Sequence, residues 1–473
     1  MYLKQKKNYF KLLYLCLFLV LILSGCTINN MANTDSEINL EPTPLELHGT
    51  VYDATNATIS VIDRDKVVYL FDKNDDTNII AENGIRIGAT VTVVYTGTLQ
   101  KTEEVQKVEI ISITIRSDQL EESNATEDLE NSNSDTINIE DDLQSMIDGM
   151  SIEEKVGQMF LTRCPSEEQV DSVSDYHLGG YILFSRDFEG KTKEQVIEQI
   201  NSYQRASNIK MFIAVDEEGG IVNRLSKYKE FRAVPFWSSQ DLYKEGGWKL
   251  IIDDTVDKAK LLKSLGINVN MAPVCDISEN PQDYIYKRSF GKNAEETSHY
   301  VEKVVKTMAD ESIGSVLKHF PGYGNNLDTH TGIAYDKREY ETFVNSDFKP
   351  FKAGIKAGAN AVLVSHNIVE SIDSEYPASL SLKMHTLLRD VFDFDGVIMT
   401  DDLYMDAIKE YSDRQEAAVT AVLAGNDLLC CTDFQVQIPA VIKAVKNGVI
   451  SESQINASVM RILKWKSDIG ILE

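Results

Sequence analysis

The chain has few positive charges for its size. It carries 47 Lys and Arg against 74 Asp and Glu in 473 residues, and its net charge is −27. A protein that binds the phosphates of nucleic acid needs a basic surface, so this deficit excludes DNA and RNA as partners. The acidity itself favours solubility. A chain of 473 residues has room for two or three domains.

Cysteine is also scarce, and its spacing forms no metal-binding pattern. Of the 6 cysteines, Cys16 and Cys26 lie near the N-terminus. The others are Cys164, Cys275, Cys430 and Cys431. Because none has Cys-x-x-Cys spacing, we predict neither a zinc site nor a disulfide framework. We expect these four to be small buried apolar residues.

The N-terminus has the pattern of a secretory signal. Several lysines precede the apolar run from Leu12 to Leu23, and Ser24-Gly25-Cys26 follows. A basic region, a short apolar region and small residues are typical of a signal peptide. The run is short for a membrane span, although an uncleaved anchor is the alternative. The ending resembles a bacterial lipobox, so we expect residues 1–26 to be the signal. Lipidated Cys26 would then anchor the protein to the outer face of the cell membrane.

Three segments of different composition follow the signal. Residues 27–46 are polar and predict a tether. Residues 47–116 contain five short β-branched runs separated by Asn and Gly turns, which predicts a small all-β domain of the oligonucleotide/oligosaccharide-binding (OB) type. Residues 117–142 are rich in Glu, Asp, Ser and Asn and cannot bury a core, so they predict a flexible acidic linker.

Residues 143–473 alternate between strand and helix patterns. The predicted strands are 158–161, 180–184, 211–215, 269–272, 314–317, 361–364, 397–399 and 427–430. The predicted helices between or after them include 294–310, 340–357 and 454–465. Eight such repeats favour an α/β fold of the (β/α)8 TIM-barrel type. The alternative is a doubly wound open sheet, but no Gly-x-Gly-x-x-Gly follows the first strand.

Polar side chains follow several of the predicted strands. Asp216, Lys318 with His319, His366 and Asp401 each lie at or just after a strand end. The carboxyl ends of barrel strands converge on one face, where active sites form. A carboxylate such as Asp401 at that face can attack a sugar's anomeric carbon. The alternative for this Asp-Asp pair is capping of the next helix, and one residue can cap while the other reacts.

A Gly- and Asn-rich loop at residues 322–327 leads to Asp328 and His330. Such a loop can bend and move. An Asp beside a His fixes its tautomer and raises its basicity. The pair can therefore protonate a departing oxygen and later deprotonate water, unless it is an ordinary surface turn.

These motifs together resemble glycoside hydrolase family 3, in its β-N-acetylglucosaminidase branch. The resemblance runs from Ile152 to Trp465 and excludes the small β domain. Its motifs are Lys318-His319-Phe320-Pro321-Gly322, Asp328-x-His330, Thr400-Asp401-Asp402-Leu403-x-Met405, Asp216-Glu217-Glu218-Gly219-Gly220, Ala272-Pro273-Val274-Cys275-Asp276, Arg288-Ser289-Phe290-Gly291 and Pro377-Ala378-Ser379-Leu380-Ser381.

The resemblance implies a role for each matched residue. Asp401 would be the nucleophile, and His330, supported by Asp328, the acid/base. The sugar in the −1 subsite would be held by Asp216, Arg288, Lys318 and His319. A two-step displacement of this kind requires neither a metal nor an organic cofactor.

The match has departures at Tyr323, Glu217 and Ile221, where relatives usually have His, Gln and Arg. The loop before Asp328 is also about one residue shorter than usual. Losing the Arg and gaining the Glu predicts a more acidic rim. Such a rim disfavours substrates with a carboxylate beside the −1 sugar.

We therefore expect a lipid-anchored, monomeric, retaining exo-β-N-acetylglucosaminidase that acts on peptidoglycan fragments or other N-acetylglucosamine glycans. The first alternative is a phosphorylase or a β-glucosidase of the same family. The phosphorylase is considered because a His acid/base does not repel phosphate as a carboxylate would. A non-catalytic wall-binding lipoprotein is the second.

Overall fold

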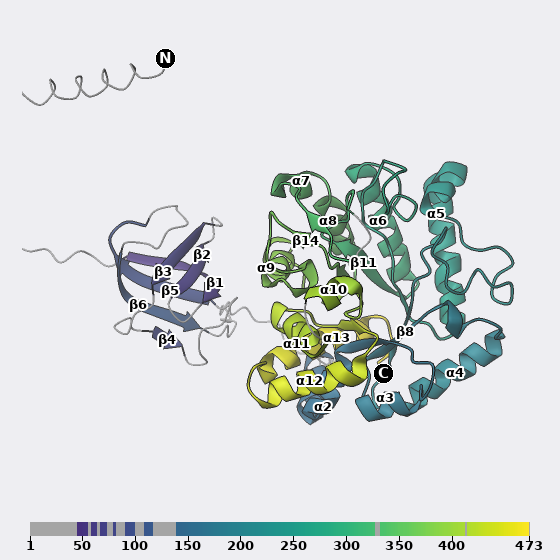
Figure 1. Cartoon of the computed structure of the whole chain (residues 1–473), viewed down its shortest axis with the longest axis horizontal. Helices are drawn as coiled ribbons and strands as arrows, with labels where there is room; N and C mark the ends of the chain where they lie inside the picture. Colours follow the sequence, from purple (N-terminus) through teal and green to yellow (C-terminus); the bar gives the residue numbers. More distant parts are fainter. Residues whose placement is uncertain are drawn as a thin grey trace, which may run out of the picture. The chain divides into compact units, whose positions relative to one another are not determined.

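A computed structural model describes residues 45–54, 58–63, 67–72, 79–81, 90–99, 108–116, 139–326, 332–411 and 414–472. Three of the predicted site residues, Cys26, Asp328 and His330, lie outside these ranges. The chain forms two compact units, residues 1–132 and 133–473 (Figure 1).

The first unit is a curled sheet of six strands. They are β1 (Leu45–Ala54), β2 (Thr58–Asp63), β3 (Val68–Asp72), β4 (Ile79–Ala81), β5 (Thr90–Thr96) and β6 (Glu109–Arg116), in the order β3-β2-β1-β5-β6-β4. Neighbours are antiparallel except β4 and β6, which run parallel. Alternate residues such as Val91 and Val93 are fully buried and form the core. The predicted all-β domain is confirmed, although β4 was not expected.

The second unit contains an eight-stranded parallel sheet. Its strands are β7 (Phe160–Arg163), β8 (Gly180–Leu183), β9 (Phe212–Val215), β10 (Val269–Asn270), β11 (Gly314–Phe320), β13 (Ala361–Val364), β15 (Val397–Thr400) and β16 (Leu429–Cys431). The sheet runs from β15 through β7 to β16, and a parallel bridge between Met399 and Leu428 joins its two ends. The predicted barrel is therefore confirmed.

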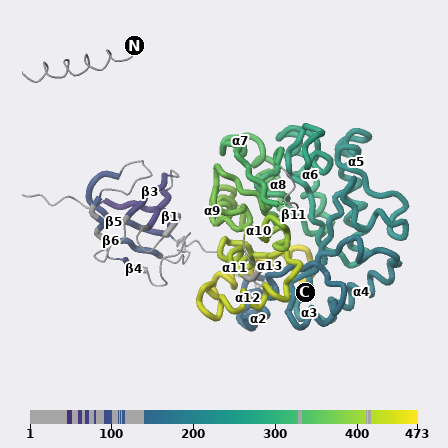
Figure 2. The backbone as a smooth tube through the Cα atoms, viewed as in Figure 1, coloured from purple at the N-terminus to yellow at the C-terminus, as the bar shows by residue number. Residues whose placement is uncertain are grey.

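Helices surround this barrel (Figure 1). They are α1 (Ile139–Gly149), α2 (Ile152–Gln158), α3 (Asp171–Tyr176), α4 (Lys193–Ala206), α5 (Ser239–Ser264), α6 (Ala294–Asp310), α7 (Tyr340–Asn345), α8 (Phe348–Lys356), α9 (Leu382–Thr386), α10 (Asp406–Tyr411), α11 (Arg414–Ala424), α12 (Phe434–Lys446) and α13 (Glu452–Asp468). Figure 2 shows the last helices, α12 and α13, beside α2, which they contact. The beginning and the end of the barrel unit thus pack together.

Two boundaries differ from the sequence predictions. Helix α1 begins at Ile139, inside the predicted linker, because its acidic first turn suits a helix N-terminus and Leu143 and Ile147 are buried one turn apart. The helix predicted over 340–357 is two helices, α7 and α8. They are separated by Ser346, whose backbone is not helical, and by buried Asp347.

The side chains of Cys164, Cys275, Cys430 and Cys431 are buried, as predicted, and all four are free thiols. No helix among the residues described is long and apolar enough to cross a membrane.

Candidate active site

The carboxyl ends of β9 and β11 bring two predicted site residues, Asp216 and Lys318, into contact. Asp216 directly follows β9, and Lys318 and His319 lie near the end of β11, where its pairing with β13 is irregular. Lys318 Nζ is 2.7 Å from Asp216 Oδ1, although 102 residues separate them in the sequence. The predicted convergence of strand ends is confirmed for this pair.

Lys318 lies at the centre of a buried ion cluster. Its ammonium also lies 2.7 Å from Glu218 Oε1, and its side chain is only 2% exposed. Arg288 donates two hydrogen bonds to the Glu218 carboxylate, from Nε to Oε2 at 3.0 Å and from Nη2 to Oε1 at 2.7 Å. Arg224 Nη2 lies 3.3 Å from the other oxygen of Asp216. Two carboxylates therefore share three cations, and all five side chains hold one another in place.

The cations keep both carboxylates ionised. Burial alone would raise the pKa of Asp216, but Lys318 and Arg224 outweigh it and the pKa lies below its usual range. Burial opposes ionisation of Glu218 in the same way, and Lys318 and Arg288 again lower the pKa. These groups can therefore accept hydrogen bonds from sugar hydroxyls, while the cations donate to oxygens.

His319 continues the chain of contacts from Arg288. Its Nε2 lies 3.0 Å from Arg288 Nη2, and its Nδ1 lies 2.7 Å from Asp276 Oδ2. A guanidinium has only donors, so Nε2 accepts and the proton sits on Nδ1, which donates to Asp276. Asp276 also accepts from the backbone N–H of His319 and of Tyr323. The ring is thereby fixed in one orientation and one tautomer.

The two aspartates after β15 have different surroundings. Asp401 is half-buried, its N–H donates to Val364 O at 3.1 Å, and its Oδ1 accepts from the Asp402 N–H at 2.8 Å. The Asp402 carboxylate accepts from the N–H of Tyr404 at 2.9 Å and from the N–H and hydroxyl of Thr432. Asp402 therefore stabilises the turn, and the role of Asp401 as the nucleophile stays a prediction.

His366 lies at the end of β13 as predicted, but it is fully buried. Its Nδ1 is 2.7 Å from Ser379 Oγ, and its Nε2 is 3.1 Å from the carbonyl oxygen of Asp402. Both ring nitrogens are thus engaged by the protein, and the ring supports the backbone of the turn that carries Asp401.

The predicted acidic rim is wrong in one respect. Glu217 has no exposed surface. Its carboxylate accepts from the N–H of Arg224 at 2.8 Å, from the N–H of Leu225 at 3.0 Å and from the Ser226 hydroxyl. Glu217 therefore stabilises the turn from which Arg224 contacts Asp216. Ile221, on the same turn, is apolar and 64% exposed.

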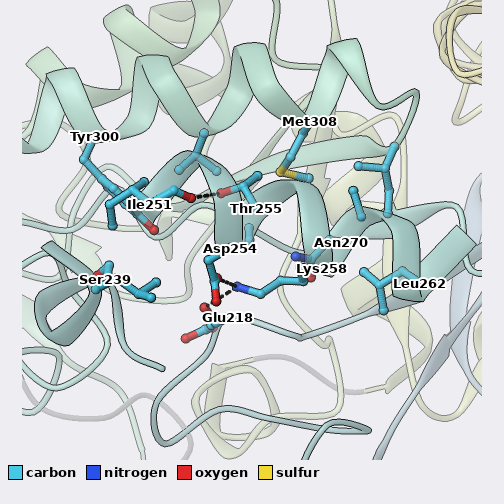
Figure 3. Close-up of a pocket in the computed structure, with 15 residues that line it drawn as sticks. Glu218, Ser239, Ile251, Asp254, Thr255, Lys258, Leu262, Asn270, Tyr300 and Met308 are labelled. Carbon is cyan, nitrogen blue, oxygen red and sulfur yellow. Dashed lines mark hydrogen bonds and ion pairs between the residues drawn. The ribbon is translucent and has the colours of Figure 1, made fainter. Parts of the chain in front are cut away.

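A second ion pair, between Lys258 and Asp254, contacts the backbone of Glu218 (Figure 3). Lys258 Nζ donates to the Glu218 carbonyl oxygen at 3.1 Å and pairs with Asp254 at 3.2 Å. The pocket around them, between α5, α6 and the barrel, has a volume of about 30 Å3. That volume suits water and is too small for a sugar, so the pocket belongs to the support of the cluster.

The sequence did not point to three residues of the site, namely Glu218, Asp276 and Arg224. Glu218 and Asp276 stand inside the motifs, but their roles depend on partners far along the chain. Arg224 lies outside every quoted motif, and no sequence signal marked it. Within the described ranges, no group of three or more His, Cys, Asp or Glu side chains is arranged to hold a metal ion.

Residues 151–465 match the family description "Glycosyl hydrolase family 3 N terminal domain". The chain belongs to glycosyl hydrolase family 3. The Beta-hexosaminidase A of Pseudoalteromonas piscicida is 28% identical over 339 residues, which cover 65% of this chain and 56% of that protein. The Beta-hexosaminidase of Hydrogenovibrio crunogenus is 31% identical over 279 residues, which cover 56% of this chain and 74% of that protein.

A solved structure is similar over the same region. The glycoside hydrolase family 3 beta-N-acetylglucosaminidase from Paenibacillus sp. str. FPU-7 has a TM-score of 0.64 and 29% identity. The match covers 68% of this chain and 63% of that one. This chain therefore spans less than two thirds of the Paenibacillus and Pseudoalteromonas proteins.

Proposed function

We propose that this protein is a retaining exo-β-N-acetylglucosaminidase. The observation that carries the proposal is the buried ion cluster on the barrel face to which Asp401 also belongs. Its members are Asp216, Glu218, Lys318, Arg288 and Arg224, and His319 contacts it through Arg288. A preorganised set of donors and acceptors around one carboxylate suits recognition of a hexose. Family membership and relatives named beta-hexosaminidases support the specificity.

The proposed reaction has two steps. Asp401 attacks the anomeric carbon while the bond to the aglycone oxygen breaks, and His330 gives its proton to that oxygen. The product of this step is a glycosyl ester on Asp401. In the second step His330 takes a proton from water, whose oxygen attacks the same carbon and releases Asp401. Asp328 would orient His330, a role that rests on the motif match.

The cluster has a defined part in this reaction. The Asp216 carboxylate can accept from sugar hydroxyls, and Lys318 and Arg288 can donate to hydroxyl oxygens or to an acetamido carbonyl. Because these groups already bind one another, they need little reorganisation when the sugar enters. A sugar that does not match this set would leave a buried charge without a hydrogen bond, which would lower its binding affinity.

The proposed setting is the outer face of the cell membrane. The basic and apolar N-terminus and the lipobox-like ending at Cys26 support a lipid anchor there. Cell-wall fragments and other glycans with terminal N-acetylglucosamine are the proposed substrates.

Substrate preference gives the first test of this proposal. The soluble form, residues 27–473, is incubated with chromogenic β-N-acetylglucosaminide and β-glucoside. Faster turnover of the N-acetylglucosaminide is expected, and faster turnover of the glucoside would overturn the specificity. Comparing the products in phosphate and non-phosphate buffer separates hydrolysis from phosphorolysis.

A trapping experiment tests the mechanism. A 5-fluoro-N-acetylglucosaminyl donor should leave one glycosyl group on the protein, and peptide mass spectrometry should place it on Asp401. A label on another residue would reject the assignment of the nucleophile.

A further inference from the structure

Arg338 forms a second charged group with Asp336 and Asp347, which is called the charged node below. Its guanidinium binds both carboxylate oxygens of Asp336, with Nε 3.0 Å from Oδ1 and Nη2 2.7 Å from Oδ2. Nη1 donates to Asp347 Oδ1 at 2.8 Å, and Nη2 donates to the Gly322 carbonyl oxygen at 3.0 Å. The Asp336 and Asp347 side chains are only 1% and 3% exposed.

These contacts join the two ends of one chain segment. Gly322 comes soon after β11, whereas Asp336 lies in the short strand β12 (Tyr335–Asp336), which pairs with β14 (Ile368–Val369). Asn326 adds a bond from its side-chain amide to Asp336 Oδ2 at 2.6 Å. Arg338 and Asp336 therefore connect the described residues on the two sides of this segment. His330 belongs to this segment by sequence.

The backbone lies too close to the node to allow side chains. A Cβ on Gly322 would lie 2.5 Å from Asp347 Oδ1, and one on Gly324 would lie 2.5 Å from the guanidinium carbon of Arg338. Both glycines have positive φ, +122° and +53°. The glycines of the predicted loop are therefore explained by direct packing of the main chain on the charged node.

A gain in folding stability does not by itself explain why the chain has this charged node. Two buried carboxylates share one guanidinium, and burial raises the pKa of Asp347 although Arg338 acts against it. Replacing buried ion pairs by apolar groups is often neutral or stabilising, whereas a fixed set of charge-assisted bonds defines one geometry. The arrangement fits a role in placing the segment.

We propose that Arg338 is a positioning residue: with Asp336 and Asp347 it joins residues 322–326 to residues 332–336, which flank the proposed acid/base in the sequence, and thereby supports proton transfer by His330. This inference rests on the proposed function, since it assigns the acid/base to that segment.

The test separates proton donation from general damage. Acid catalysis matters for a poor leaving group and little for 2,4-dinitrophenolate, which departs without a proton. In Arg338→Lys, kcat/KM for an alkyl β-N-acetylglucosaminide should fall about 10- to 100-fold. For the dinitrophenyl substrate it should fall at most about threefold. Hydrogen–deuterium exchange between residues 322 and 336 should become faster.

Arg389→Lys is the matched control. Arg389 is as exposed as Arg338, at 21%, and also binds an aspartate, Asp427. It donates to the Gly396 carbonyl oxygen at 2.7 Å, next to the start of β15, the opposite end of that strand from Asp401. Its replacement should lower stability without making the loss depend on the leaving group and without faster exchange in residues 322–336.

The outcomes are distinct. Equal losses on both substrates, no loss, or unchanged exchange in Arg338→Lys would overturn the positioning role, as would the same pattern in the control. If Arg338→Lys does not fold, Asp336→Asn, which keeps the Arg338–Asp347 pair, is expected to show the same leaving-group dependence. A wild-type protein inactive on both substrates would reject the proposed function, and the exchange measurement would then decide the clamp by itself.

Discussion

At the scale of single residues, neighbouring carboxylates of the same type differ in what they bind. The carboxylate of Asp402 accepts hydrogen bonds from Tyr404 and Thr432. The carboxylate of Glu217 accepts hydrogen bonds from the backbone of its own turn. Asp401 lies one position before Asp402 and follows the carboxyl end of β15. Glu218 lies one position after Glu217 and belongs to the ion cluster. A shift of one residue therefore separates a structural carboxylate from a candidate functional one.

The two aspartates after β15 give a matched pair of substitutions. Asp401→Asn should lower kcat by roughly a thousandfold or more while leaving the melting temperature nearly unchanged, because only the nucleophile is lost. Asp402→Asn should retain activity within about tenfold and lower the melting temperature, because it weakens charge-assisted bonds to Tyr404 and Thr432. Steady-state kinetics and thermal unfolding of both variants measure this. The reverse pattern would exchange their roles.

Residue type and strand position predict part of the site. The strand ends of a barrel converge on one face, and the sequence therefore points directly to the polar residues at or just after them: Asp216, Lys318, His319 and Asp401. Arg288 lies on a connection between β10 and α6, and only the resemblance marks it. Asp276 and Arg224 become visible through their partners, which the folded chain brings together.

At the scale of elements, long periodic segments are predictable and short ones depend on packing. All eight barrel strands were predicted within a few residues, since each is a buried apolar run. The three-residue strand β4 is too short to show a period. At the break between α7 and α8, Asp347 binds Arg338, a contact that no local pattern encodes.

The turn between β9 and α5 supports a prediction at this scale. Glu217→Gln keeps one acceptor oxygen for the N–H groups of Arg224 and Leu225, so activity should fall less than about tenfold. Glu217→Ala leaves those buried donors without a partner and should cost about 1–3 kcal/mol of unfolding free energy. The same substitution should also raise KM, because the turn no longer holds Arg224 in contact with Asp216. Chemical denaturation and kinetics check both variants, and equal effects of Gln and Ala would contradict this account.

Helix α13 carries a buried lysine that makes stability depend on pH. Lys466 has no exposed surface, donates to Gln158 Oε1 at 2.7 Å, and burial lowers its pKa from 10.5 to about 7. The unfolded chain thus binds more protons than the folded one between pH 7 and 10.5. The destabilisation is full below pH 7 and is lost as the pH rises toward 10.5.

Replacement of this lysine isolates its titration. The unfolding free energy of the wild type, measured relative to Lys466→Met, should increase by about 1 kcal/mol per pH unit above pH 7. Urea denaturation between pH 6.5 and 9 measures the difference. Lys464→Met, at an exposed position of the same helix, controls for the loss of one positive charge. A difference that does not change with pH would show that Lys466 does not titrate in this window.

At the scale of the whole molecule, every described residue of the candidate site comes from the second of the two units. Its first and last helices, α1 and α13, also pack together, so the barrel unit has its own closed core. A fragment of residues 133–473 should therefore fold and keep kcat/KM for a small chromogenic N-acetylglucosaminide within about twofold of residues 27–473. A loss above about tenfold would show that the first unit completes the site. If only digestion of insoluble cell wall falls in the fragment, the first unit acts in docking to the wall, because the chemistry on a small substrate is then intact.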